Sequence, residues 1–197
     1  MSYTTQDEFD VLHGLRIKGM TQPAEIAAAA GLEDATVQSV LDDAVATEHV
    51  RHRSSGRVQG YMLTASGRER HAALRPDHVP AQLDDLAAAY EAFLAPNRAF
   101  KELTTKWQTE ADGDLSVVLG DLLAVDEGVG KVVAQASGSI PRMQSYEPRF
   151  KKALNAIQSG DSSALAKPMS GSYHDVWMEL HEDLLLTLGR ECSDADG

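Results

Sequence analysis

The chain has 197 residues, of which 43% are hydrophobic and 24% charged, and its formal net charge at pH 7 is −12. This is an ordinary globular composition, and the acidity argues against a protein that coats nucleic acid non-specifically, because affinity of that kind is carried by cations that pair with phosphates. The sequence has no apolar run of 18 or more residues and no charged-then-apolar leader, so we expect a cytoplasmic protein without a membrane partner.

Three helical patterns occupy the first 50 residues. "QDEFDVLHGLRIKGM" repeats its apolar side chains at helical spacing, with acidic residues in the first turn. "TQPAEIAAAAGL" opens with a capping Thr and an early Pro, and it ends at Gly31. "LEDATVQSVLDDAVATEHV" then places Val37, Val40, Leu41, Ala44 and Val45 on one face. Because only a short turn containing Gly31 separates the second pattern from the third, the pair predicts a helix-turn-helix.

A basic ribbon follows these helices. Residues 51–75 contain six arginines against Glu69 alone, a net charge of +5 within an acidic chain. "HVRHRS", "SG" and "RVQGYMLT" indicate two short extended runs around a glycine turn, and "TASGRERHAAL" indicates a capped helix start. Three helices followed by a β-hairpin predict a winged helix, with the arginines on and beside the wing.

Residues 9–74 resemble the winged helix-turn-helix module of bacterial transcription regulators, in the broad style of the MarR family. The resemblance rests on "AEIAAAAGLEDATVQSVLDDAVATEHV" and on "RHRSSGRVQGYMLTASGRER" with its "LTxxGR" exit. It implies that the second helix of the pair enters the major groove of double-stranded DNA and that the wing lies along the backbone or in the minor groove. The residues that would make these contacts are Thr36, Gln38, Ser39, Arg51, Arg53, Arg57 and Gln59.

The predicted reading helix departs from that family pattern. "LEDATVQSVLDDAV" has four carboxylates and a single Gln, without Lys or Arg, whereas reading helices usually offer Arg, Lys, Asn or Gln to the bases. Each carboxylate near a phosphate opposes binding, so affinity would depend on the wing and on Thr36, Gln38 and Ser39. The wing arginines have two interpretations that stay open: contact with DNA, and solubilising charge that pairs with the acidic second half.

A change of composition near "LRPDHVP" predicts a domain boundary between residues 75 and 76. Residues 1–75 hold 8 Lys or Arg against 10 Asp or Glu, a net of −2, and residues 76–197 hold 10 against 20, a net of −10. The second half has helical patterns throughout. The fold prediction is therefore a mainly α protein, with an N-terminal winged helix-turn-helix followed by a C-terminal helical bundle.

This second half is similar to the helical region that accompanies the winged helix in actinobacterial MarR-type regulators. A similar segment is attached to some phosphoenolpyruvate-utilising enzymes. The resemblance rests on "FLAPNRAFKELTTKWQ", "KPM" and "SYHDVWMELHEDLLLTLGR".

The last helical stretch, residues 167–190, brings two histidines, a tryptophan and four carboxylates close together in the sequence. His174, Trp177, Met178 and His181 share one helical face. The two histidines lie two turns apart, roughly 10 Å, which is too far to hold one ion directly, so no metal site is expected. An ordinary core and a pocket for a small-molecule effector both fit this face. The pocket residues would be Asn97, Arg98, Phe100, Trp107, Tyr173, His174, Trp177 and His181.

The sequence favours a DNA-binding transcriptional regulator that is a homodimer through residues 81–107 and 172–189 and is gated by an effector or partner. No enzyme and no cofactor are expected, because phosphate loops, nucleophile elbows and zinc-protease helices are missing from the sequence. One alternative is a winged helix repurposed for protein or small-molecule contact, and its acidic reading helix favours protein contact. The other is an enzyme that uses His174 with Asp175, or His181 with Glu182, in acid–base chemistry.

Overall fold

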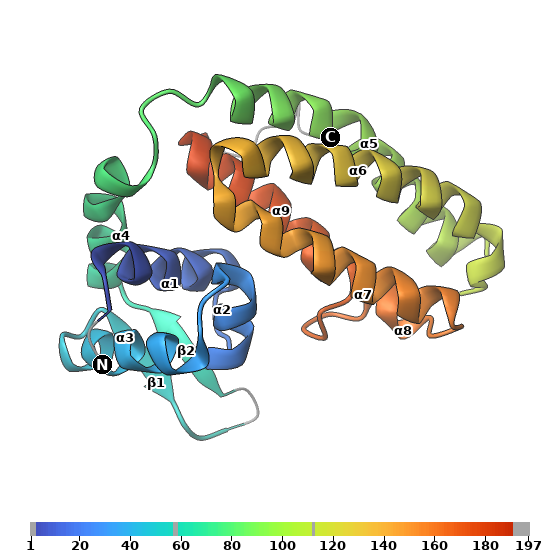
Figure 1. Cartoon of the computed structure of the whole chain (residues 1–197). Helices are drawn as coiled ribbons and strands as arrows, with labels where there is room; N and C mark the ends of the chain where they lie inside the picture. The colour runs from blue at the N-terminus through green and yellow to red at the C-terminus, as the bar shows by residue number, and fades with distance from the viewer. Residues whose placement is uncertain (1–2, 57–58, 112, 191–197) are drawn as a thin grey trace. The chain divides into compact units, whose positions relative to one another are not determined.

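The computed structural model describes residues 3–56, 59–111 and 113–190, and this part of the chain is mainly helical with one small two-stranded sheet (Figure 1). The chain divides into two compact units, Met1–Gln82 and Leu83–Gly197. The boundary predicted after residue 75 falls inside helix α4 (Ala65–His78), which continues through Pro76. Pro76 lies in the last turn, so the backbone hydrogen bond that it removes is followed by only two further helical residues.

In the first unit, three helices precede a hairpin and a fourth helix follows it. The helices are α1 (Thr5–Lys18), α2 (Pro23–Ala30) and α3 (Asp34–Ala46), and strands β1 (Val50–Arg53) and β2 (Gly60–Leu63) pair in antiparallel fashion before α4. A capping box between Thr4 and Asp7 begins α1. Gly31, in the left-handed conformation at φ 69°, ends α2 so that α3 can begin after a short turn.

The core of the first unit contains a pair of imidazoles that joins α1 to α4. Nδ1 of His13 lies 2.9 Å from Nε2 of His71, and both side chains are buried. The ring of Phe9 stacks on His71 with centroids 5.1 Å apart. Nearby, Glu8 accepts two hydrogen bonds of 2.7 Å from Arg70. One facing imidazole nitrogen must donate while the other accepts, so the tautomer of one ring determines that of the other.

Two glycines let the hairpin approach its neighbours closely. A Cβ atom at Gly60 would lie 2.6 Å from the backbone oxygen of Thr21, which forms an isolated bridge with Tyr61. A Cβ atom at Gly67 would lie 1.9 Å from the backbone oxygen of His49. Because both obstacles are backbone atoms, a larger residue at either position would require the main chain to move.

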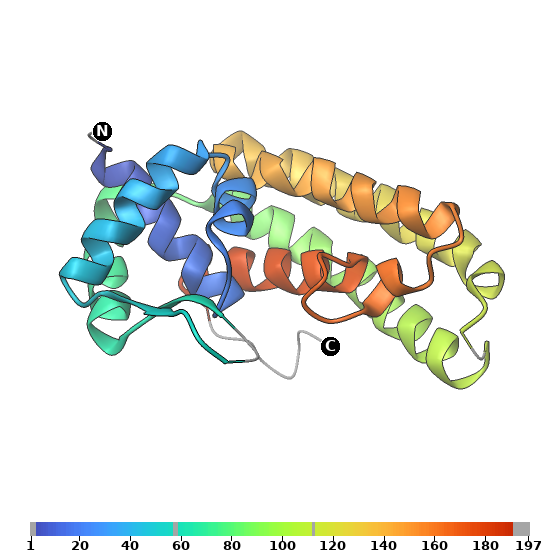
Figure 2. The same ribbon diagram turned by 90° about the horizontal axis from the view of Figure 1, so that it is seen from below.

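The described part of the second unit is built from helices. They are α5 (Asp84–Thr109), α6 (Leu119–Ser139), α7 (Tyr146–Gln158), the short α8 (Ser163–Ala166) and α9 (Tyr173–Leu188), with 3₁₀ turns η1 (Leu115–Val117) and η2 (Pro141–Ser145). Helices α5 and α6 run side by side, and α7 and α9 pack against them and against each other (Figures 1 and 2). Their apolar faces form one core, as expected when amphipathic helices pack together.

A buried polar cluster joins η2 and α7 to α9. Nη2 of Arg142 donates to Oδ1 of Asp183 at 2.7 Å and to the hydroxyl of Thr187 at 2.6 Å. The hydroxyl of Tyr146 donates to Oδ2 of Asp183 at 3.1 Å. Burial, followed by the charge of Asp183, raises the pKa of Tyr146 well above its ordinary value. The guanidinium group of Arg142 and the phenol of Tyr146 offset the cost of burying the Asp183 carboxylate. The cluster therefore specifies how α9 aligns with its neighbours.

Candidate functional site

The basic side chains of β1 lie on the outer face of the hairpin. Val50 of this strand is buried, and His52 stacks on Tyr61 with ring centroids 4.2 Å apart. Arg51 and Arg53, which alternate with these two residues, are exposed. Because successive side chains of a strand point to opposite faces, both arginines project from the same face. The hairpin therefore presents two guanidinium groups to solvent.

The turn of the hairpin helps to position these groups. Nε of Arg53 donates to the backbone oxygen of Ser55 at 3.2 Å. Gln59 is exposed, and its backbone oxygen accepts a 2.8 Å hydrogen bond from the amide of Gln22. Arg57, also predicted to contact DNA, lies outside the described residues. The described hairpin residues of the predicted DNA interface are thus all accessible.

A surface hollow of about 630 Å³ lies at the base of the hairpin. Its lining joins the end of α3 and the adjoining turn to β1 and the start of α4: Val45, Glu48, Val50, Arg51, His52, Thr64, Ala65 and Ser66. The hydroxyl of Thr64 caps α4 by accepting the N–H of Gly67. The hollow therefore combines a guanidinium group, an imidazole and hydroxyl groups with one carboxylate.

The three predicted DNA-contact residues on α3 are half-buried: Thr36, Gln38 and Ser39. Nε2 of Gln38 donates to Oδ1 of Asp42 at 2.7 Å and to the hydroxyl of Tyr61 at 3.4 Å. The amide of Gln38 therefore points toward the hairpin and is occupied by the chain itself.

The exposed surface of α3 is acidic. Glu33, Asp34, Asp42 and Asp43 are all exposed, and the helix contains neither Lys nor Arg. Burial of the Tyr3 phenol, followed by its hydrogen bond to Asp43, raises the pKa of Tyr3 to about 12. A phosphate that approached this face would meet negative charge, which opposes binding.

Five of the eight predicted pocket residues are buried in the core of the second unit: Asn97, Phe100, Tyr173, Trp177 and His181. Nε1 of Trp177 donates to Oδ1 of Asn97 at 2.8 Å, and Phe100 stacks on Trp177 with centroids 4.5 Å apart. His181 packs against Phe93 at 5.3 Å. These side chains occupy the space between α5 and α9 themselves, which is the packing of a hydrophobic core.

The other three predicted pocket residues lie at the margin of the core of the second unit. His174 is half-buried, with its ring 6.1 Å from that of Phe100, and Trp107 is also half-buried. Arg98 is exposed on α5. None of the eight predicted pocket residues lines the hollow at the base of the hairpin or the groove between α5 and α6.

A half-buried carboxyl group and a buried phenol meet beside this core. The hydroxyl of Tyr173 donates to Oδ1 of Asp126 on α6 at 2.9 Å. Burial raises the pKa of Asp126, although the hydrogen bond acts in the opposite direction. Burial and the nearby carboxylate also raise the pKa of Tyr173. The proton therefore stays on the phenol, and the pair holds α9 to α6.

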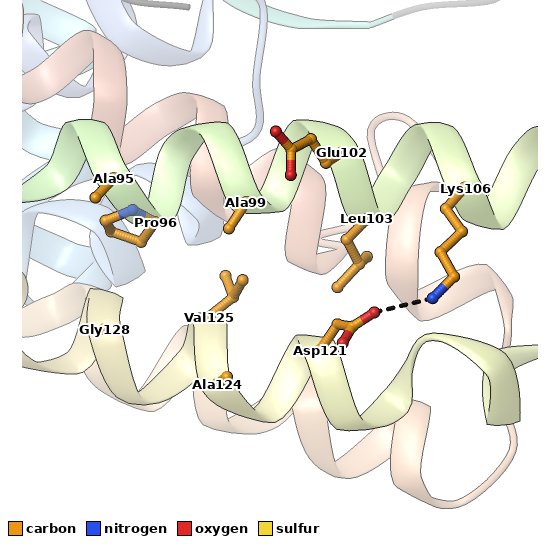
Figure 3. A pocket seen from close by; sticks show the side chains of 10 residues that line it. All are labelled: Ala95, Pro96, Ala99, Glu102, Leu103, Lys106, Asp121, Ala124, Val125 and Gly128. Carbon is orange, nitrogen blue, oxygen red and sulfur yellow. Dashed lines mark hydrogen bonds and ion pairs between the residues drawn. The ribbon is translucent and has the colours of Figure 1, made fainter.

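A groove of about 550 Å³, which the sequence does not predict, lies between α5 and α6 (Figure 3). Its lining residues are mostly small: Ala95, Pro96, Ala99, Glu102, Leu103, Lys106, Asp121, Ala124, Val125 and Gly128. Nζ of Lys106 lies 3.1 Å from Oδ2 of Asp121 at one end. Pro96 faces Gly128, where an added Cβ would lie 3.3 Å from the Pro96 Cβ. The four-residue spacing of Ala95 and Ala99 was the available signal for this surface.

No family model, curated protein or solved structure matches this chain. Within residues 3–56, 59–111 and 113–190, no three His, Cys, Asp or Glu side chains gather as metal ligands. The described helices are also too short or too polar to cross a membrane.

Proposed function

We propose that the chain is a DNA-binding transcriptional regulator whose first unit is a winged helix. One observation carries the proposal: Arg51 and Arg53 project from one face of a hairpin that directly follows the helix pair α2 and α3. In winged helices, the hairpin lies along the DNA backbone while the second helix of the pair faces the major groove. The short turn through Gly31 supports the helix-turn-helix assignment.

The hairpin supplies most of the affinity in this proposal. The surface of α3 is acidic, and Gln38 is held by Asp42 and Tyr61. Thr36 and Ser39 are the other two α3 residues predicted to contact bases. Guanidinium groups on phosphates position a protein without reading sequence. We therefore expect binding that depends steeply on salt and discriminates weakly between sequences.

The test is fluorescence anisotropy of a labelled duplex from the protein's own upstream DNA, titrated at several salt concentrations. Relative to wild type, a variant with Arg51→Ala and Arg53→Ala should bind more weakly. Its slope of log K against log salt should be shallower by about 1.8, because each phosphate contact contributes about 0.9. Lys151→Ala with Lys152→Ala removes two exposed cations from α7 and is the matched control. Absence of wild-type binding at low salt, or equal losses in both variants, would reject the proposal.

The regulator is proposed to be a homodimer, because one winged helix contacts too few base pairs for a specific site. Of the two segments predicted for the interface, α9 is mostly buried within its own unit. Helix α5 keeps an exposed face that includes Ala88, Ala92 and Ala95. We therefore assign dimerisation to α5. Effector binding at Asn97 and Trp177 would require the core around them to open.

The acidic face of α3 favours a second candidate function, which is docking to a basic protein. Helix α3 would face the DNA phosphates if the chain is a regulator. The exposed residues along it include Asp34, Asp42 and Asp43. Charge complementarity at this face would favour a cationic partner over DNA. Neutralising one of these carboxylates separates the two functions, because it should strengthen DNA binding and weaken docking to a cationic protein.

A further inference from the structure

We propose that a second copy of this chain docks on the α5–α6 groove, with its α5 crossing the first α5 in the antiparallel direction. The inference rests on the homodimer of the proposed function and specifies its interface. Ala95 and Ala99 on α5 face Ala124 and Gly128 on α6 across the groove (Figure 3). Side chains this small allow a second helix to approach closely, because the distance between packed helices depends on the side chains at the contact.

The charges along α5 complement those of an antiparallel copy. Asp84 and Lys106 lie eleven positions before and after Ala95, and all three share one side of the helix. A two-fold axis at Ala95 would therefore bring Asp84 of each copy opposite Lys106 of the other, whose ammonium also pairs with Asp121 of its own chain at 3.1 Å. A parallel arrangement would instead bring identical charges together, so the sequence selects the antiparallel crossing.

A second charge pair lies closer to the proposed axis. Glu91 precedes Ala95 by four positions and Arg98 follows it by three, and both are exposed. The same antiparallel crossing places Glu91 of one copy diagonal to Arg98 of the other, and within its own chain Glu91 also pairs with Arg190 at 3.0 Å. Acidic side chains are thus concentrated before the axis, and Arg98 and Lys106 follow it, with Glu102 as the one acidic exception on this face.

Glycines of α6 extend the surface of small residues beyond the groove. A Cβ added at Gly120 or Gly138 would meet no atom within 4 Å, so packing within the chain does not require glycine at either position. Gly120 and Gly138 stand in the first and last turns of α6, where side chains from a second copy could reach them. Both positions lie toward the side of α6 that carries Ala124. Close approach of a second copy supplies a reason for small residues there.

Sedimentation equilibrium of the full chain, without DNA, tests this interface. Wild type should be a dimer, and Ala95→Glu should weaken dimerisation by at least about tenfold because it places two carboxylates at the axis. Ala134→Glu is the matched control, since Ala134 is an exposed alanine on α6 outside the groove lining. Circular dichroism should show that both variants keep the helical content of wild type.

A charge-swap experiment tests the direction of the crossing. Asp84→Lys and Lys106→Glu should each weaken the dimer, whereas the double variant should recover most of the lost affinity. All three variants also carry Asp121→Asn, because Lys106→Glu would otherwise set a second carboxylate beside Asp121. A monomeric wild type, or an Ala95→Glu variant that dimerises as tightly as wild type, would overturn the interface. These readouts are independent of DNA: a monomer that binds DNA overturns the interface alone, and a dimer that does not bind DNA overturns the proposed function alone.

Discussion

The indole Nε1 of Trp177 donates a hydrogen bond of 2.8 Å to Oδ1 of Asn97, and each side chain is only 1% exposed. The bond joins α9 to α5 among stacked aromatic rings, beside Phe100. A buried N–H that loses its acceptor costs about 1–3 kcal/mol, because water cannot replace the missing partner. This single amide therefore contributes to the stability of the second unit.

We predict that Asn97→Ala lowers the free energy of unfolding of the second unit by about 2–4 kcal/mol, from the lost acceptor and the small cavity left behind. Arg98→Ala alters the exposed neighbour and should change stability by less than about 0.5 kcal/mol. Urea unfolding followed by tryptophan fluorescence measures both, because Trp107 and Trp177 lie in this unit. Equal stability of Asn97→Ala and wild type would contradict the assignment of Asn97 to the core.

Asp126 gives the second unit a pH dependence of predictable sign. Burial raises its pKa in the folded state, so the folded chain holds this proton more tightly than the unfolded chain does. Its contribution to stability is therefore full below the unfolded pKa and is lost as the pH rises through the raised folded pKa. Asp126→Asn removes the charge and keeps an oxygen acceptor for Tyr173.

This variant should have a higher urea midpoint than wild type at pH 7. The difference should vanish near about pH 3, where the wild-type carboxyl is protonated in both states. Glu127→Gln is a control of opposite sign, because hydrogen bonding and charge from Lys131 lower the pKa of Glu127. A fluorescence-detected urea titration at both pH values measures these effects. A less stable Asp126→Asn at pH 7 would show that its ionised carboxylate stabilises the fold.

Gly67 and Gly130 should respond in opposite ways to a single methyl group. Gly67→Ala would place Cβ 1.9 Å from the backbone oxygen of His49, whereas Gly130→Ala meets no atom within 4 Å. We expect Gly67→Ala to destabilise the first unit by about 3 kcal/mol or more. Gly130→Ala should stabilise the second unit by up to about 1 kcal/mol through helix propensity.

Hydrogen exchange of peptides from α1 and α4 reports on the first unit, and tryptophan fluorescence during urea unfolding reports on the second. Gly67→Ala should lose protection in α1 and α4, while Gly130→Ala should raise the urea midpoint. Unchanged exchange in Gly67→Ala would show that the main chain near His49 moves at little cost.

The helices and the hairpin of the first unit could be predicted because their signals are local. Gly31 ends α2, and Thr64 begins α4 through a hydroxyl that accepts the backbone N–H three residues ahead. The end of α4 was harder to predict, because Pro76 breaks a helix interior but is tolerated in a final turn. The coarse order of elements therefore follows from the sequence, while the exact division into units does not.

The candidate sites depend on contacts that sequence spacing cannot supply. His174, Trp177 and His181 share a helical face whether that face lines a cavity or fills a core, and Asn97, eighty residues away from Trp177, decides in favour of packing. The orientation of Gln38 likewise depends on Tyr61 in a different element. The α5–α6 groove could not be predicted, because the sequence does not show which residues of the two helices lie opposite each other.

Asp42 offers the sharpest separation between the two candidate functions of the first unit. Its exposed carboxylate accepts a hydrogen bond from Gln38 at 2.7 Å, and the oxygen of Asp42→Asn can keep that bond. The substitution therefore removes negative charge from the surface of α3 while preserving its local structure. If α3 faces phosphates, DNA affinity should rise by about two- to fivefold, which corresponds to less than about 1 kcal/mol.

Fluorescence anisotropy with the upstream duplex measures this gain, which should shrink as salt is added because exposed charges are screened. Glu110→Gln neutralises an exposed carboxylate in the second unit and should leave DNA affinity unchanged. Unchanged affinity in Asp42→Asn would place α3 away from the DNA and leave the hairpin as the contact. A loss of affinity would mean that Asp42 itself contacts a base, as carboxylates do when they accept a hydrogen bond from the amino group of cytosine.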